Sequence, residues 1–232
     1  MNHSLSLIYL VYNEQATLAA VLDEALAFCR DNLSADWQIV VVDDGSADAS
    51  AAIAADFADR HAGIDVVRHE RNRGMGAAMA TGVAAARSDY FVFLSADGQA
   101  PVSELPRLLS LMNRADIVVS TYERGRSMSR SVLSGGLRVL MRVAAGIRFQ
   151  LEGLYVFPTA AAQQLAPAIE ADTFFFSFEL IDRGLAEGLT LAQTTMAYRQ
   201  REAGQSKVAN LRRVRRVAGE VLRYARRKRA RR

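Results

Sequence analysis

Carboxylate side chains follow two apolar segments of this sequence, at positions where a binding site can form. Asp97 lies just after the apolar residues 90–94, and Asp43 and Asp44 come directly after residues 38–42. Such runs are typical of strands buried on both faces, and open α/β sheets bind ligands at the carboxyl ends of their strands. A single Asp there can bind a hard divalent cation that is also bound by the oxygens of a diphosphate. Asp97 could equally open a turn or cap the helix that follows it.

The adjacent pair Asp43 and Asp44 favours a second polar contact at the same edge. Two neighbouring carboxylates are costly to remove from water, so we expect one of them to accept a hydrogen bond from a ligand. Ser46 or Asp48 is expected to cap the helix of residues 49–60. The alternative is a polar turn that binds nothing.

The apolar pattern predicts the elements that position these side chains. Strands are expected over residues 4–11, 38–42, 64–67, 90–94, 116–121, 153–158 and 189–198, with helical patterns between most of them. Asn13 is the expected N-cap of the first helix, and another helix is expected over residues 101–112. This alternation predicts an α/β fold, with a mixed, mainly parallel sheet flanked by helices.

Glycines open the third helix, but they do not form a dinucleotide-binding motif. Gly74 and Gly76 lack a third glycine at the required offset, and they follow the third strand rather than the first. Small residues at this position can bring backbone N–H groups close to an anion, or they can let the helix pack tightly on the sheet. Both interpretations stay open at this point.

Composition excludes several classes of protein. The 232 residues contain the single cysteine Cys29, so no internal disulfide can form, and the three histidines have no zinc-ligand spacing. No run of 18 apolar residues occurs, so no bilayer span is expected. Of the 29 Lys and Arg residues, 11 lie in residues 212–232, together with one of the 25 acidic residues. That segment has a net charge of +10, and the rest of the chain has −6.

The basic segment has the pattern of an amphipathic helix. Apolar side chains keep helical spacing from Leu211 to Ala225, with arginines on the other face. We expect this helix to anchor the protein to an anionic membrane, with each basic residue near the surface adding about 1 kcal/mol. Nucleic-acid binding is the rival interpretation, but neither interleaved aromatic residues nor a motif supports it. No nucleic-acid partner is therefore expected.

Five short motifs recur in the order and spacing of one enzyme family. They are Tyr12-Asn13-Glu14, Val42-Asp43-Asp44-Gly45-Ser46, Asn72-x-Gly74-x-Gly76, Ser95-Ala96-Asp97-Gly98 and Arg201-x-x-Gly204-x-Ser206-Lys207. The chain resembles inverting family 2 glycosyltransferases of the GT-A fold, and most of all the polyprenyl-phosphate sugar synthases of the dolichol-phosphate-mannose-synthase type. The resemblance implies a Rossmann-like GT-A domain over residues 1–207, with a nucleotide-binding half (1–121) and an acceptor half (122–207). The basic tail covers residues 208–232.

The resemblance also implies roles for particular residues. Asp43 and Asp44 would contact the nucleotide, Asp97 would bind Mg²⁺ or Mn²⁺, and Arg201 would offset charge on the leaving diphosphate. Arg124 and Arg130 would receive the acceptor phosphate. The implied contacts to the nucleotide diphosphate sugar, its metal and the acceptor are Tyr12, Asn13, Glu14, Asp43, Asp44, Asn72, Gly74, Ser95, Ala96, Asp97, Arg124, Arg130, Ser206 and Lys207.

Two positions depart from the family pattern. Ser95 stands where the metal-binding Asp-x-Asp motif has its first Asp, and Phe149 stands where the family usually has an Asp four residues before Gly153. Glu152 lies near that position and could substitute as a catalytic residue. Glu179 matches a family Glu near the sugar, although a Glu on a helix surface fits the pattern equally well.

These observations lead to one main hypothesis and two alternatives. The main hypothesis is inverting transfer of a hexose from a nucleotide diphosphate sugar to a polyprenyl phosphate, by a protein peripheral to the cytoplasmic, inner face of a membrane. A phosphate acceptor needs no base, whereas a glycan or glycolipid hydroxyl would need one, with Glu152 or Glu179 as candidates. The other alternative is a protein that binds nucleotide sugars with little catalysis.

Overall fold

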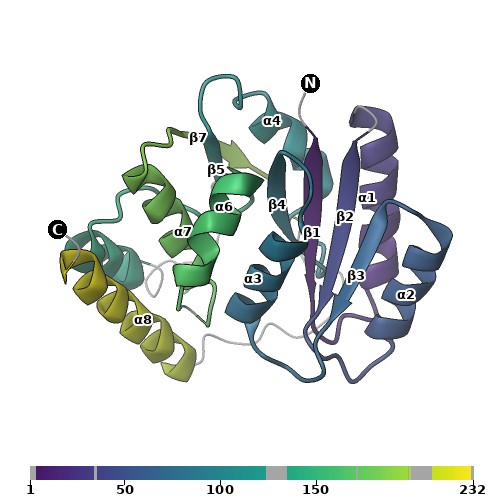
Figure 1. Ribbon diagram of the computed structural model, residues 1–232, viewed down its shortest axis with the longest axis horizontal. Helices are drawn as coiled ribbons and strands as arrows, with labels where there is room; N and C mark the ends of the chain where they lie inside the picture. The colour runs from purple at the N-terminus through teal and green to yellow at the C-terminus, as the bar shows by residue number, and fades with distance from the viewer. Residues whose placement is uncertain are drawn as a thin grey trace.

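The computed structural model describes residues 4–33, 36–123, 135–170, 172–197, 199 and 211–230. A seven-stranded sheet forms its centre, with the strand order β3-β2-β1-β4-β6-β5-β7 (Figure 1). Only β6 runs antiparallel to its neighbours β4 and β5. This confirms the α/β fold with a mixed, mainly parallel sheet. The strands are β1 (Leu5–Val11), β2 (Trp37–Asp43), β3 (Ile64–Arg68), β4 (Tyr90–Ser95), β5 (Ile117–Tyr122), β6 (Tyr155–Pro158) and β7 (Leu191–Met196).

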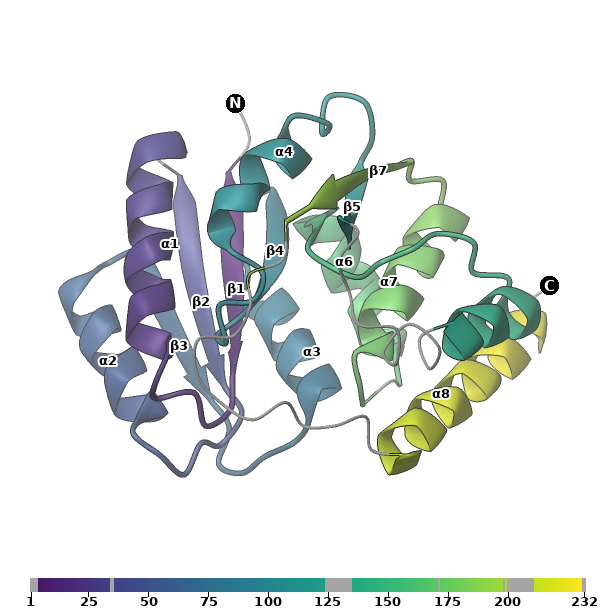
Figure 2. The ribbon, with the colours of Figure 1, turned by 180° about the vertical axis from the view of Figure 1, so that it is seen from behind.

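Helices cover both faces of the sheet because the central strands are apolar on both sides. One face buries Ile8, Val40 and Phe91 beneath α3, α6 and α7, and the other buries Leu7 and Ile39 beneath α1, α2 and α4 (Figures 1 and 2). The expected helix over residues 101–112 is shorter than predicted. The helices of these layers are α1 (Leu18–Asn32), α2 (Ser50–Arg60), α3 (Met75–Ala85), α4 (Leu105–Leu109), α6 (Thr159–Leu165) and α7 (Phe175–Ala186), with 3-10 turns at Val102–Glu104 and Ala166–Ala168.

The parallel strands end together at one edge of the sheet. Val11 at the end of β1 lies opposite Asp43 of β2, and Leu10 lies opposite Ser95 of β4. Asp43 in turn lies opposite Arg68 at the end of β3. The loops that follow these four strands therefore leave the sheet side by side, as the sequence predicted.

Helix α8 (Leu211–Ala230) packs against α7 and the π-helical turn η2 (Met141–Ala145), as both views show (Figures 1 and 2). Val217, Val221 and Ala225 on its apolar side are at most 5% exposed. This side therefore completes the core of the domain, and the expected membrane anchoring by this helix stays a prediction that its other side would have to fulfil. The outward side of α8 is basic, with exposed Arg215, Arg223, Arg226 and Arg229.

Candidate functional site

The loop after β1 is braced by the loop after β2. Asn13 has a φ of 55°, a left-handed conformation that Asn tolerates better than most residues. Its backbone N–H donates to Ser46 Oγ (3.0 Å), and its side-chain Oδ1 accepts from the N–H of Ala47 (2.9 Å). The prediction that Asn13 caps the first helix is wrong, because α1 begins five residues later and the side chain holds the neighbouring loop instead.

Residues on either side of Asn13 differ in exposure. Tyr12, directly after β1, is 41% exposed. Glu14 is held by its backbone N–H, which donates to Ser50 Oγ at the start of α2 (2.9 Å). Asp48 accepts from the N–H of Ser50 (3.0 Å). The prediction that Ser46 or Asp48 caps this helix is wrong, because the N-cap position of α2 is Ala49, and no side-chain cap hydrogen bond forms there. Hydrogen bonds from Ser50 and Gln15 outweigh its desolvation and keep the pKa of Asp48 below the usual range.

Asp43 is fully buried, and one of its carboxylate oxygens has no hydrogen-bond donor among the described residues. Its Oδ1 accepts from the N–H of Ser46 (2.9 Å), and Arg68 Nε lies 3.1 Å from its Oδ2. That approach lacks hydrogen-bond geometry, so Oδ2 is a buried acceptor with no hydrogen bond from the described residues. The Arg68 guanidinium offsets the charge of Oδ2, but the oxygen still lacks the hydrogen bond that buried acceptors usually have.

Asp44 has a different environment, because the protein itself occupies its carboxylate. Oδ1 accepts from the N–H of Arg73 (2.8 Å), and Oδ2 accepts from the N–H of Gly74 (2.9 Å). His69 Nδ1 lies 2.7 Å from Oδ1, and its Nε2 lies 2.9 Å from Thr81 Oγ1. Asp44 therefore holds the segment before α3 against the end of β2. A direct contact of Asp44 with the nucleotide stays a prediction.

Gly45 after β2 and Gly74 before α3 allow these two loops to approach each other closely. Gly45 and Gly74 have φ values of 71° and 92°, and a Cβ at Gly45 would lie 2.5 Å from the backbone of Arg71. The N–H groups of Gly74 and Gly76 donate to Asp44 and to the carbonyl of Asp172. A carboxylate of the protein thus binds at this helix start. Asn72 is exposed in the same segment.

The loop after β4 carries the predicted metal ligand. Thr17 Oγ1 donates to the carbonyl of Ala96 (2.7 Å), which fixes this loop against the start of α1. Asp97 is partly buried, and its Oδ1 accepts from the N–H of Gln99 (3.1 Å). Ser95 is exposed at the strand end. In the described part of the chain, no group of three or more His, Cys, Asp or Glu side chains is arranged to hold a metal ion.

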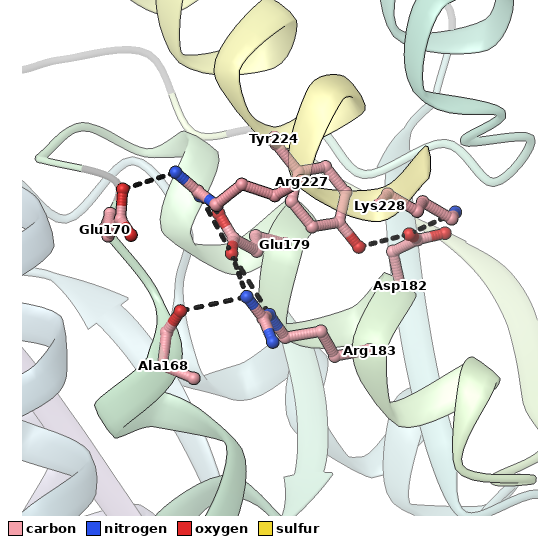
Figure 3. Close-up of polar contacts among 8 residues, drawn as sticks. All are labelled: Ala168, Glu170, Glu179, Asp182, Arg183, Tyr224, Arg227 and Lys228. Carbon is pink, nitrogen blue, oxygen red and sulfur yellow. Dashed lines mark hydrogen bonds and ion pairs between the residues drawn. The ribbon is translucent and has the colours of Figure 1, made fainter. Parts of the chain in front are cut away.

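The two candidate bases are both engaged in ion pairs. Glu152 Oε1 lies 2.6 Å from Arg138 Nη1. Glu179 is completely buried, and its carboxylate contacts Arg183 (2.7 Å) and Arg227 of α8 (3.2 Å), as Figure 3 shows. Phe149, at the position of the family Asp, stacks on Phe178 with ring centroids 5.7 Å apart. That position therefore belongs to the apolar core.

A second set of polar contacts beside Glu179 joins the same two helices. Asp182 of α7 accepts from Tyr224 Oη (2.5 Å) and Lys228 Nζ (2.5 Å), both on α8 (Figure 3). Burial, together with Asp182, raises the pKa of Tyr224, so its hydroxyl keeps its proton and donates it. These contacts hold α8 on the domain.

The remaining predicted site residues lie outside the described part of the chain. These are Arg124, Arg130, Arg201, Ser206 and Lys207. Sequence reasoning missed His69, Arg68 and Thr17, which position the predicted carboxylates and loops. His69 and Arg68 stand at the end of β3, so their place at the ligand-binding edge was the available signal.

Comparison with known proteins places this geometry in a family. Residues 6–181 match the family described as glycosyl transferase family 2. Dolichyl-phosphate beta-glucosyltransferase of Dictyostelium discoideum is 25% identical over 228 residues, covering 89% of this chain and 69% of that protein. Undecaprenyl-phosphate 4-deoxy-4-formamido-L-arabinose transferase of Pectobacterium carotovorum is 34% identical over 146 residues, covering 62% of this chain and 44% of that protein.

A solved structure has the same fold. Glucosyl-3-phosphoglycerate synthase from Mycobacterium tuberculosis, in complex with Mn²⁺, UDP-glucose and phosphoglyceric acid, superimposes with a TM-score of 0.71 and 22% identity. The match covers 97% of this chain and 80% of that chain. The family match over residues 6–181 is consistent with the observed strand order and with the loops that lie at one edge of the sheet. The chain belongs to glycosyl transferase family 2.

Proposed function

We propose that this glycosyltransferase moves a hexose from a nucleotide diphosphate sugar to a polyprenyl phosphate at a membrane surface. The observation that carries the proposal is the buried, unsatisfied Oδ2 of Asp43 on the sheet edge that also bears Asp97. The two relatives named above are called transferases of dolichyl phosphate and undecaprenyl phosphate, which supports this class of acceptor. This chain spans 69% and 44% of their lengths.

The donor nucleotide would bind at the ends of β1 and β2. Asp43 Oδ2 is ion-paired with Arg68 but has no hydrogen-bond donor among the described residues, and a base N–H would supply one. The exposed ring of Tyr12 offers a flat surface on which the base can stack. Asp44 and Asn13 would act indirectly, by holding the two loops in place.

A divalent cation, Mg²⁺ or Mn²⁺, would bind at Asp97 between the protein and the diphosphate. The donor set fits, because one carboxylate suits a hard cation that takes its other ligands from phosphate oxygens and water. When bound, such a cation neutralises charge that develops on the leaving diphosphate. The solved relative with Mn²⁺ and UDP-glucose supports the choice of cation and donor class.

Transfer to a phosphate would proceed without a base from the protein. An acceptor phosphate oxygen, already an anion, attacks C1 of the sugar from the face opposite the diphosphate. The new C1–O bond forms as the bond to the diphosphate breaks, its electron pair leaves with the diphosphate, and the configuration inverts. The apolar packing of Phe149 is consistent with this, because no carboxylate stands at that position.

A hydroxyl acceptor is less well supported by the described residues. It would need a general base, and a base must be free to take a proton. Glu152 is paired with Arg138, and Glu179 is buried between Arg183 and Arg227. These ion pairs disfavour either carboxylate as a base, and a catalytic role for Glu152 or Glu179 stays a prediction.

A thermal-shift panel tests donor binding. Wild-type protein is heated with UDP, GDP, dTDP or CDP, each with and without Mg²⁺ or Mn²⁺. At a hundredfold excess over Kd, a nucleotide adds about 2.7 kcal/mol, which is roughly 5–10 °C in Tm for a chain of this size. We expect one nucleotide to give a shift that the metal enlarges. Absence of a shift with all four nucleotides would contradict the proposed donor site. Nucleotide binding without transfer to any polyprenyl phosphate would favour a binding protein.

Peripheral membrane contact needs a surface other than the buried side of α8. None of the described helices is both long and apolar enough to cross a bilayer. Val139 and Val143 are 62% and 76% exposed, four residues apart beside α8, and Leu222 of α8 is 45% exposed. Exposed arginines accompany them, at Arg142, Arg223, Arg226 and Arg229. We propose that this surface meets anionic headgroups on the cytoplasmic face of a membrane.

Vesicle co-sedimentation tests this surface. The double variant Val139→Asp, Val143→Asp is expected to lose binding to vesicles of phosphatidylcholine and phosphatidylglycerol, because it places two carboxylates against anionic lipid. Arg60→Glu changes the net charge equally on α2, at the far end of the sheet from α8 (Figure 1), and should bind like wild type. Equal sedimentation of the double variant and wild type would show that the surface is not the contact.

A further inference from the structure

Helix α8 carries a buried carboxylate that neither the proposed transfer nor the membrane contact uses. Glu220 is 3% exposed. Its Oε2 accepts from Thr173 Oγ1 (2.5 Å), and its Oε1 accepts from the backbone N–H of Asp172 (3.3 Å). A buried carboxylate is stable only with such donors, so this pair of contacts ties α8 to the segment that precedes α7.

The peptide backbone of Asp172 also contacts the start of α3. Its carbonyl accepts from the N–H of Gly76, in the first turn of α3, at 3.0 Å. A Cβ at Gly74 would lie 3.3 Å from the same carbonyl, so the two segments touch directly. One residue therefore donates to α8 through its N–H and accepts from α3 through its carbonyl.

The loop after β2 also holds the segment at the start of α3. Arg73 and Gly74 donate their N–H groups to Asp44, whose neighbour Asp43 carries the unsatisfied acceptor. A chain of contacts thus leads from Glu220 through Asp172 to the loop after β2. Its three hydrogen bonds are 3.3 Å or shorter, and the short backbone segment from Gly76 to Gly74 joins the second to the third.

We propose that Glu220 is a positioning residue for the nucleotide-sugar site and couples the seating of α8 to donor affinity. The inference rests on the proposed function, in that Asp43 and the loop after β2 bind the nucleotide. Because coupling between two sites is reciprocal, a bound nucleotide would in turn hold α8 more firmly on the domain. Since α8 also borders the proposed membrane surface, membrane contact and donor binding would then share this link.

A merely structural role is the rival explanation, and α8 offers a matched control for it. Arg227, two turns further along α8, contacts Glu179 and Glu170 (Figure 3), and neither of these partners belongs to α3. Arg227→Met should loosen α8 without reaching the start of α3. Glu220→Ala should loosen α8 and also remove the hydrogen bond of the Asp172 N–H, leaving, of the described contacts between Asp172 and α8, only the exposed ion pair with Arg216. The two variants therefore separate the seating of α8 from the positioning of α3.

Calorimetric titration tests the inference with whichever of UDP, GDP, dTDP and CDP binds wild type. Glu220→Ala is expected to weaken that nucleotide at least fivefold, the lower end of ordinary coupling between sites. Arg227→Met is expected to keep the wild-type Kd. If Glu220→Ala does not fold, Thr173→Val removes the hydroxyl contact to Glu220, together with the weaker one from the Phe175 N–H, and should change the Kd in the same direction. Hydrogen exchange at the amide of Gly76 should be faster in the Glu220 or Thr173 variant than in Arg227→Met.

Each outcome decides a different point. A wild-type Kd in Glu220→Ala, or in Thr173→Val if it is the variant used, would overturn the inference and leave the proposed function intact. Equal weakening in Arg227→Met would reduce Glu220 to a structural role. Failure of wild type to bind any of the four nucleotides would overturn the proposed function, and this inference with it.

Discussion

Asp97→Asn should lower the rate of sugar transfer about 10²- to 10³-fold, the usual loss when one electrostatic contact to a transition state is removed. The amide keeps the shape of the side chain and can still accept from the N–H of Gln99, so the loop should keep its conformation. It lacks the charge that binds a hard cation. Initial rates with saturating donor and Mn²⁺ measure the effect.

Two controls make this result specific to the carboxylate. Asp59→Asn makes the same chemical change at an exposed position in the last turn of α2 and should keep the wild-type rate. Asp97→Asn should retain the wild-type Tm, and any nucleotide binding that needs no metal should persist. A variant that transfers sugar at more than a tenth of the wild-type rate would exclude Asp97 as the metal ligand.

Glu179→Ala should lower the free energy of unfolding by about 3–5 kcal/mol, because it leaves two guanidinium groups facing each other inside the protein. Glu179 is completely buried, and both Arg183 and Arg227 contact it. Urea unfolding measures the change. Asp56→Ala is the matched control, since Asp56 pairs with Arg60 at the same i,i+4 spacing on an exposed helix surface. It should cost about 0.3–0.5 kcal/mol.

The same residue separates a structural role from the predicted catalytic one. Glu179→Gln keeps the side-chain volume and part of the hydrogen bonding, and we expect it to transfer sugar at close to the wild-type rate once folded. Complete loss of transfer in a stable Glu179→Gln protein would instead support Glu179 as a base. A Glu179→Ala variant within 1 kcal/mol of wild type would contradict the buried ion pairs.

Features set by contiguous residues were predictable. Apolar runs of five or more residues predicted the central strands, and the rule that parallel strands end together predicted that Asp43, Asp44 and Asp97 share one edge. The different roles of Asp43 and Asp44 were not predictable. They depend on His69 and on the segment before α3, which lie about 25 to 30 positions away in the sequence.

Helix α8 shows a second limit of the sequence. An apolar stripe with arginines opposite is the same pattern whether the stripe faces lipid or protein, and only the partner surface decides. Here α7 and η2 supply that surface, and the polar contacts of Tyr224 and Lys228 fix the choice. Likewise, the position of Glu179 in α7 gave no sign of Arg227, which lies 48 residues later.

The packing of α8 bears on how the polypeptide matures during its synthesis. The side of α7 that carries Glu179 and Asp182 is closed by residues about 40 to 50 positions further along. At about 5–20 residues per second, a ribosome takes several seconds to make that stretch. Until α8 emerges, the carboxylates of α7 have no partner from it, whereas β1 to β4 can already pair. A chaperone or protease would therefore encounter a nascent chain in which β1 to β4 can pair, but in which α7 is not yet covered by α8.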